Sequence, residues 1–159
     1  MTKTPWLNST VIAFLQKIIT KDFRILELGA GASTVWFAKR AGYVLSYENK
    51  KKWFDSVTEE LRKAGLKNCK LIFDPAYPKN GIQELQGQFD LILIDGRGRV
   101  KNTAITMVHV KSGGYLMLDD SQRGRYNIIR KLLSAWGKIE LIEPGIVRTT
   151  TVWKRNVQI

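Results

Sequence analysis

The stretch Arg24-Ile-Leu-Glu-Leu-Gly-Ala-Gly-Ala-Ser-Thr34 is followed directly by Val35-Trp36-Phe37-Ala38-Lys39-Arg40. This pattern predicts a buried strand, a glycine turn and a helix. Gly29 and Gly31 lack a Cβ atom, so the backbone can bend sharply after the strand and approach a ligand closely. Ser33 and Thr34 are placed to cap the helix, whose first amides would point toward the same ligand. The stretch therefore predicts a cofactor-binding loop.

Different classes of protein use such a loop, and the residues around it distinguish them. A phosphate-binding loop ends in Gly-Lys-Ser/Thr, but the first lysine after these glycines is Lys39, which excludes that class. A dinucleotide-binding fold has a third glycine where this chain has Thr34, so a nicotinamide cofactor is disfavoured. A tight turn that binds no ligand is the remaining alternative.

Length and composition predict one domain over residues 1–159, because 159 residues with 44% apolar composition can build a single core. Cys69 and His109 are the only residues of their types, which excludes an internal disulfide and a Cys/His zinc cluster. No apolar run reaches the ~18 residues of a membrane span. We expect a cytoplasmic protein that does not enter a membrane. The sequence predicts no oligomeric state.

The chain is strongly basic, with 26 Lys and Arg against 14 Asp and Glu, a net charge of +12 and a pI near 10.0. Such a charge favours an anionic partner, RNA included. The alternative is that the lysines only solvate the surface. Both interpretations are compatible with the sequence.

The hydrophobic pattern predicts an α/β fold. A helix within residues 1–21 is expected to pack on the sheet, with Trp6 more often packed than bordering a pocket. A helix begins at Asn49, and another is expected to bury Leu132 and Trp136. Expected strands cover residues 23–28, 43–48, 69–73, 89–94, 115–118, 138–142 and 148–153. Right-handed crossovers then give a three-layer, Rossmann-like, mostly parallel sheet of seven strands with a C-terminal antiparallel hairpin.

Acidic residues follow several of these strands directly, at the sheet edge where ligands of open α/β sheets bind. Glu48 is placed to accept from both hydroxyls of a ribose, or else only caps the following helix. Asp74 is placed to receive an adenine amino group, or else forms an Asp-Pro turn. The other acids at this edge are Asp95, Asp119 and Asp120.

The motifs ELGAGAST, Tyr47-Glu48, FDLILIDG and a Gly-Gly strand ending in Asp-Asp resemble, in order, those of class I S-adenosylmethionine-dependent methyltransferases. The resemblance covers nearly the whole chain. It implies the three-layer fold, S-adenosyl-L-methionine as cofactor and methyl transfer as the reaction. It also implies the cofactor contacts, which would be Glu27, Gly29, Ala30, Gly31, Ser33, Thr34, Glu48, Asn49, Asp74 and Asp95.

Within that family, Ile94-Asp95-Gly96 and the strand ending in Asp119-Asp120 look like metal-dependent O-methyltransferases. This resemblance implies Mg²⁺ bound by Asp95, Asp119 and Asp120, next to the acceptor hydroxyl. The alternatives are that these acids orient loops, or that one of them is a general base. Asp95 and Asp120 are the candidate catalytic residues in either case.

Four arginines flank the same edge, namely Arg97, Arg99, Arg123 and Arg125. They would either hold a carboxylate or phosphate of the acceptor or neutralise the acids. The sequence therefore favours methyl transfer to an oxygen, or a nitrogen, of a small anionic acceptor. The alternatives are an RNA methyltransferase, or a basic RNA- or polyanion-binding module on the same fold that has lost catalysis.

Overall fold

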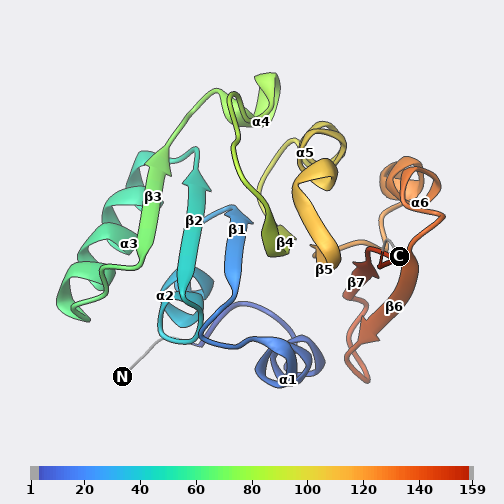
Figure 1. Cartoon of the computed structure of the whole chain (residues 1–159), viewed down its shortest axis with the longest axis horizontal. Helices are drawn as coiled ribbons and strands as arrows, with labels where there is room; N and C mark the ends of the chain where they lie inside the picture. The colour runs from blue at the N-terminus through green and yellow to red at the C-terminus, as the bar shows by residue number, and fades with distance from the viewer. Residues whose placement is uncertain (1–3, 158–159) are drawn as a thin grey trace.

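Seven strands form one sheet within residues 4–157, the part of the chain that this computed structural model describes (Figure 1). The strand order is β3-β2-β1-β4-β5-β7-β6. β1 to β5 are parallel to one another, whereas β7 is antiparallel to both β5 and β6. The strands are β1 (Arg24–Leu28), β2 (Tyr43–Glu48), β3 (Cys69–Phe73), β4 (Phe89–Ile94), β5 (Val110–Leu118), β6 (Gly137–Ile142) and β7 (Thr149–Lys154). The predicted seven-stranded sheet with a terminal hairpin is confirmed.

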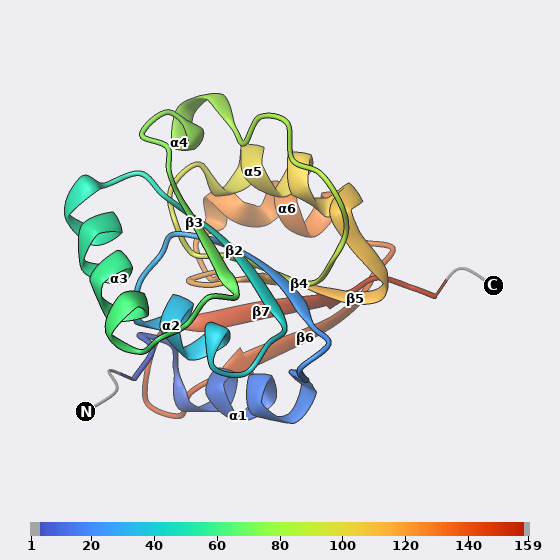
Figure 2. The ribbon, with the colours of Figure 1, turned by 60° about the vertical axis from the view of Figure 1, so that its left-hand side comes forward.

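Helices cover both faces of this sheet and make three layers (Figure 2). α1 (Ser9–Ile18), α2 (Ala32–Ala38) and α3 (Lys51–Lys63) lie on one face. α4 (Tyr77–Asn80), α5 (Arg99–Thr106) and α6 (Asn127–Leu132) lie on the other. Short 3-10 turns, Met107–His109 and Gly124–Tyr126, follow α5 and precede α6. None of the helices in the described part of the chain is long and apolar enough to span a membrane.

The core consists of two apolar layers, one on each face of the sheet. Along β4, Leu91 and Leu93 pack with α1, α2 and α3, whereas Ile92 and Ile94 pack on the opposite face. All four side chains are fully buried. Burying each one stabilises the fold by about 1.5–3 kcal/mol. A strand covered on both faces is apolar at nearly every position, which explains the sequence of β4.

The strand order reverses between β1 and β4, which places a crevice at the ends of these two strands. Leu28 and Ile94, their last residues, are register partners. The Leu28 carbonyl accepts hydrogen bonds from the amides of Asp95 at 3.0 Å and Gly96 at 2.6 Å. The loops that follow β1 and β4 are therefore fixed next to each other.

Three expectations need correction. β5 begins at Val110 rather than residue 115, because extra residues around Gly113, which has φ +76°, are accommodated as an irregularity against β4. α3 begins at Lys51 rather than residue 49, because the Glu48 side chain takes the preceding amides. Leu132 is 44% exposed and not buried, since α6 ends there and turns this side chain outward.

Candidate functional site

The loop after β1 depends on its two glycines for different reasons. Gly29 has φ +99°, and a Cβ there would lie 2.7 Å from the Gly96 amide nitrogen. A glycine is needed at position 29 because this loop packs directly against the turn after β4. A Cβ at Gly31 would meet nothing within 4 Å, so the space beside Gly31 is open. Gly29 therefore allows packing, and Gly31 leaves room for a ligand.

Glu27 lies fully buried beneath this loop. Its carboxylate accepts hydrogen bonds from the hydroxyls of Ser33 at 2.5 Å, Thr34 at 2.5 Å and Ser46 at 2.7 Å. The Thr34 hydroxyl also accepts from the Gly31 amide at 3.0 Å. Burial raises the pKa of Glu27 to about 7, against the opposing effect of the three hydroxyl donors. Glu27 and Thr34 thus hold the loop from below and line neither of the cavities described next.

Two adjoining cavities lie above the loop and form one groove. They share Gly29, Ala30, Trp53 and Asp95. The first, of about 260 Å³, is also lined by Glu48, Asn49, Lys50, Gly96, Arg97 and Arg99. The second, of about 190 Å³, is also lined by Trp6, Leu7, Gly31, Ala32, Ser33, Ser56, Val57 and Glu60. Most of the predicted cofactor residues, from Gly29 to Asp95, therefore border one groove.

Glu48 and Asp74 end neighbouring strands but are placed differently. Glu48 is 4% exposed, and its Oε1 accepts from the amides of Asn49 at 2.8 Å and Lys50 at 2.7 Å. Among the described residues, nothing donates to its Oε2, so Glu48 caps the chain before α3 and still presents an oxygen to the first cavity. Asp74 Oδ1 accepts from the amides of Ala76 and Tyr77, as in the Asp-Pro turn alternative, and Asp74 lines neither cavity.

Asp95, after β4, is the acid that faces the groove. Its side chain is 28% exposed and lies 3.3 Å from Nη2 of Arg99. Burial, followed by the negative charge of the neighbouring Asp119, raises the pKa of Asp95 to about 7. At neutral pH this carboxyl group is therefore close to half ionised. A group with such a pKa can take up or release a proton during a reaction.

Asp119 and Asp120, after β5, are occupied by other side chains. Asp119 is fully buried, accepts from the Thr150 hydroxyl at 2.7 Å and pairs with Arg148. Asp120 has φ +49° and lies 3.0 Å from Nη2 of Arg123 and 3.2 Å from Nε of Arg148. The positive charge that three adjacent acids require is thus supplied by arginine.

The expected magnesium site stays a prediction, and the structure shows what else these acids contact. Residues 4–157 contain no group of three or more His, Cys, Asp or Glu side chains placed to hold a metal ion. The structure brings Asp95 and Asp119 together, but Arg148 takes the carboxylates of Asp119 and Asp120. No motif near Arg148 or Thr150 indicates a role at this site, because both residues reach it only when the hairpin pairs with β5.

The flanking arginines divide into two groups. Arg99 is 10% exposed and donates to the carbonyls of Asp95 at 2.7 Å, Gly96 at 2.9 Å and Asp119, so it ties the ends of β4 and β5 together. Arg123 pairs with Asp120. Arg97 and Arg125 are exposed and have no carboxylate partner among residues 4–157. Arg99 and Arg123 therefore neutralise acids, whereas Arg97 borders the first cavity and Arg125 lies over the Tyr126 ring.

The N-terminal segment forms part of the wall of the second cavity, which was the less favoured of the two positions expected for Trp6. Trp6 is 74% exposed rather than packed, and its ring meets that of Trp53 edge-to-face at 5.5 Å. Leu7 fills the buried position instead, and Asn8 caps α1 by accepting from the Val11 amide. Trp53 lines both cavities because the first turns of α3 lie beside the end of β2. Trp53 stands five residues after Glu48 in the chain, and this short separation was the only indication in the sequence that its ring would lie near the end of β2.

No protein-family model matches this sequence, and no curated protein does. Solved structures of other proteins do match the fold of this chain. A structure of an rRNA methylase from Streptococcus thermophilus has a TM-score of 0.72 and 14% identity, covering 99% of each chain. A protein of Streptococcus mutans named as a methyltransferase and solved with SAH has a TM-score of 0.74 and 15% identity, covering 97% of this chain and 99% of the other. A SAM-dependent O-methyltransferase from Thermotoga maritima has a TM-score of 0.73 and 14% identity, covering 100% and 69%.

Proposed function

We propose that this chain, which has the fold of the class I S-adenosylmethionine-dependent methyltransferases, transfers a methyl group from S-adenosylmethionine to an anionic acceptor. The observation that carries the proposal is the groove at the β1–β4 reversal, where the open side of Gly31, the free oxygen of Glu48 and the titratable Asp95 border one space. S-adenosylmethionine, when bound, supplies an electrophilic methyl group on its sulfonium.

The residues of the groove fit this cofactor. A ligand can approach the backbone at Gly31 closely, because there is no side chain there and the space beside it is open. Glu48 Oε2 would accept from the ribose hydroxyls, and Asn49 lies beside it. Ser33, at the end of the loop, borders the second cavity. Asp74 lies outside both cavities, so an adenine contact there requires the ligand to extend past the groove.

Asp95 is the residue we assign to proton transfer. It lines both cavities, and a pKa of about 7 leaves a large share of it ionised at neutral pH. The ionised carboxylate would remove the proton from an acceptor hydroxyl or amine as the methyl group arrives. Asp120 is a weaker candidate, because Arg123 and Arg148 hold its carboxylate. We assign Asp120 to positioning Arg148.

Arg97 supports a negatively charged acceptor. Its guanidinium is exposed at the first cavity and has no carboxylate partner among residues 4–157, so it is available for a bidentate contact with a carboxylate or phosphate. The sequence favours a small anionic molecule as the methyl acceptor, with oxygen, or nitrogen, as the methylated atom. The alternatives were RNA as the acceptor or a basic binding module without catalysis. The net charge of +12 favours a polyanion such as RNA as the acceptor.

Calorimetric titration with S-adenosylmethionine and its demethylated product tests the cofactor. Glu48→Gln should bind at least about tenfold more weakly per lost ribose hydrogen bond, because a hydrogen bond to a charged group contributes about 1.5–3 kcal/mol. Glu59→Gln, an acid on the outer side of α3, is the matched control and should bind normally. Tighter binding of a nicotinamide dinucleotide than of S-adenosylmethionine would contradict the proposal.

The reaction is tested by following transfer of a labelled methyl group to pools of small molecules and of RNA. Transfer to either pool supports an enzyme. Cofactor binding without transfer to any pool would favour the non-catalytic module instead. Asp95→Asn should abolish transfer while leaving cofactor affinity within a few fold, since its main role is assigned to the acceptor.

A further inference from the structure

The mouth of the groove carries cations that no acid neutralises. Lys50 and Arg97 line the first cavity. Lys52, on the first turn of α3, precedes Trp53 in the chain and lines neither cavity. All three are exposed, and none has a carboxylate partner within residues 4–157. Of the acids at this edge, Asp119 and Asp120 pair with arginines, and Asp95 lies 3.3 Å from Arg99. Glu48 accepts from the amides before α3 and keeps one oxygen toward the first cavity. Positive charge therefore remains unpaired where the acceptor must enter.

Flat apolar surface lies beside these cations. Trp6 leaves 74% of its surface exposed, although its ring contacts Trp53 edge-to-face. Trp53 lines both cavities and follows Lys52 in the chain. Two indole rings next to unpaired lysines and an arginine are the combination that single-stranded nucleic acids bind, because bases stack on the rings and phosphates contact the cations.

We infer that the methyl acceptor is an unpaired nucleotide of single-stranded RNA, whose base stacks on Trp6 while the flanking phosphates contact Lys50, Lys52 and Arg97. The inference rests on the proposed methyltransferase function and names its acceptor. RNA fits better than duplex DNA because a groove that takes one stacked base needs an unpaired one, which RNA offers in loops and bulges.

The spacing of the cations agrees with such a strand. Lys50 follows β2 and Arg97 follows β4, and β1 lies between these strands. Two inter-strand spacings separate the strand ends by about 10 Å. A stacked single strand advances about 3.4 Å per nucleotide, so about three nucleotides span this distance. The target base and its two neighbours would lie along the mouth of the groove, beside the bound cofactor.

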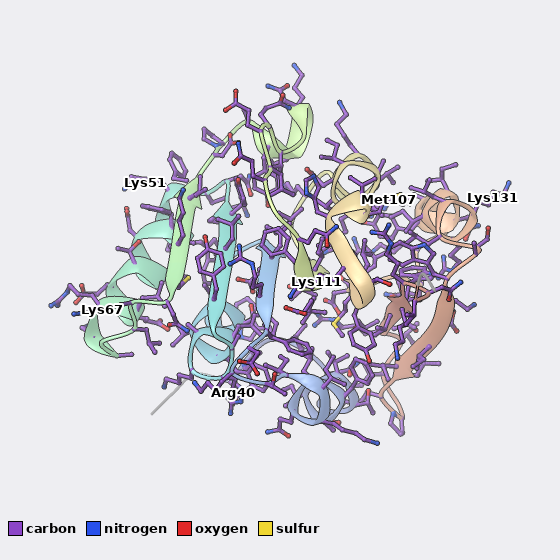
Figure 3. The ribbon with its side chains drawn as sticks, viewed as in Figure 1. Arg40, Lys51, Lys67, Met107, Lys111 and Lys131 are labelled. Carbon is purple, nitrogen blue, oxygen red and sulfur yellow. The ribbon has the colours of Figure 1, made fainter. Side chains whose placement is uncertain are left out.

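Net charge alone does not support this site, because basic residues lie on all sides of the molecule. Figure 3 shows Arg40, Lys51, Lys67 and Lys131 on different edges. These charges attract any polyanion without positioning it. Lys67 precedes β3, and Lys70 is the second residue of that strand. Both are exposed and lie at the opposite edge of the sheet from the groove. They provide a control with the same change in charge.

Fluorescence anisotropy with a labelled single-stranded RNA oligonucleotide, with the demethylated cofactor present, tests the inference. Affinity is measured between about 50 and 200 mM salt. Lys50→Gln combined with Lys52→Gln should reduce the slope of log affinity against log salt by about 1.4, because each phosphate contact on a single strand contributes about 0.7. Lys67→Gln combined with Lys70→Gln should leave the slope unchanged. An equal reduction in both variants would show diffuse attraction and overturn the inference.

Stacking is tested separately with Trp6. Trp6→Ala should weaken RNA binding about 5- to 150-fold, the range for losing one stacked base, and Trp6→Phe should recover part of this loss. Because Trp6 is mostly exposed, the melting temperature should stay unchanged in both variants. Unchanged affinity in Trp6→Ala would refute the stacking contact, and with it the assigned binding mode.

Two further comparisons identify the occupant. The same sequence as duplex RNA and as single-stranded DNA should bind more weakly, and stronger binding of either would overturn the choice of single-stranded RNA. Cofactor affinity, measured by calorimetry on every variant, separates the two levels of the proposal. If the natural chain binds S-adenosylmethionine but not RNA, this inference alone is refuted. If the natural chain does not bind S-adenosylmethionine, the proposed function is refuted.

Discussion

Replacing Glu27 by Gln should change how the stability of the protein depends on pH. The Glu27 carboxyl group is fully buried beneath the glycine loop and accepts hydrogen bonds from three hydroxyls. Burial disfavours its charged form, whereas the hydroxyl donors favour that form. Burial has the larger effect, and the pKa of Glu27 is raised from 4.5 to about 7. Gln has nearly the same shape but cannot ionise.

The direction in which stability changes with pH follows from how many protons the folded and unfolded chains bind. Between pH 4.5 and 7 the folded chain keeps the Glu27 proton that the unfolded chain has lost. The stabilisation from Glu27 is therefore fully present below pH 4.5 and is lost as pH rises through 7. At about 1.4 kcal/mol per pH unit, the loss over this interval is about 3 kcal/mol. Glu27→Gln should lack this decline.

Urea unfolding of the natural chain and of Glu27→Gln, at several pH values across this interval, measures the effect. The difference between the two curves isolates Glu27 from other groups, such as Asp95, that titrate in the same range. Glu59→Gln, which removes an acid that is paired with Arg62 on the surface, should keep the decline. Parallel curves for the natural chain and Glu27→Gln would refute the reasoning, since they would mean that the hydroxyl donors fully offset the effect of burial on the pKa of Glu27.

The two loop glycines should separate stability from binding. Gly29→Ala should lower the melting temperature because its Cβ overlaps Gly96, whereas Gly31→Ala should fold normally and bind S-adenosylmethionine more weakly by calorimetry. Methyl transfer by the natural chain should rise with pH through about 7, as Asp95 ionises, and a flat profile would contradict its role as a base. Arg148→Met should destabilise the fold by about 3–5 kcal/mol in urea unfolding, because Asp119 would be left buried and unpaired. Added Mg²⁺ should not shift the melting temperature of the natural chain, since arginines already balance these acids.

The sequence predicted the sheet well because its local signals agree with one another. Arg24 to Thr34 combines an apolar strand, two glycines and capping residues, so each signal indicates the same strand, turn and helix. Acids that directly follow parallel strands must meet at one edge of the sheet, so Glu48 and Asp95 could be placed near the loop in advance. Both line the first cavity.

What the sequence could not predict depends on long-range pairing or on side-chain direction. Arg148 reaches Asp119 because β7 runs antiparallel beside β5, and no nearby residue indicates that contact. The local motif around Asp95, Asp119 and Asp120 likewise gives no indication that a distant arginine pairs with two of these acids. Trp6 was expected to be packed, but the direction of a side chain before a helix cap follows from which neighbour, here Leu7, fills the core.

The N-terminal segment is attached to the far end of the chain, and this has a consequence for folding order. Asn8 Nδ2 donates to the Leu141 carbonyl, and the Ser9 hydroxyl donates to Glu143 at 3.0 Å, across 134 positions of sequence. Contacts between such distant residues form late, because the intervening chain must first be ordered. During synthesis, the residues around Trp6 emerge before the β6–β7 hairpin, so the contacts of Asn8 and Ser9 cannot form until that hairpin has been made. The side of the second cavity that Trp6 and Leu7 line is therefore fixed late in folding.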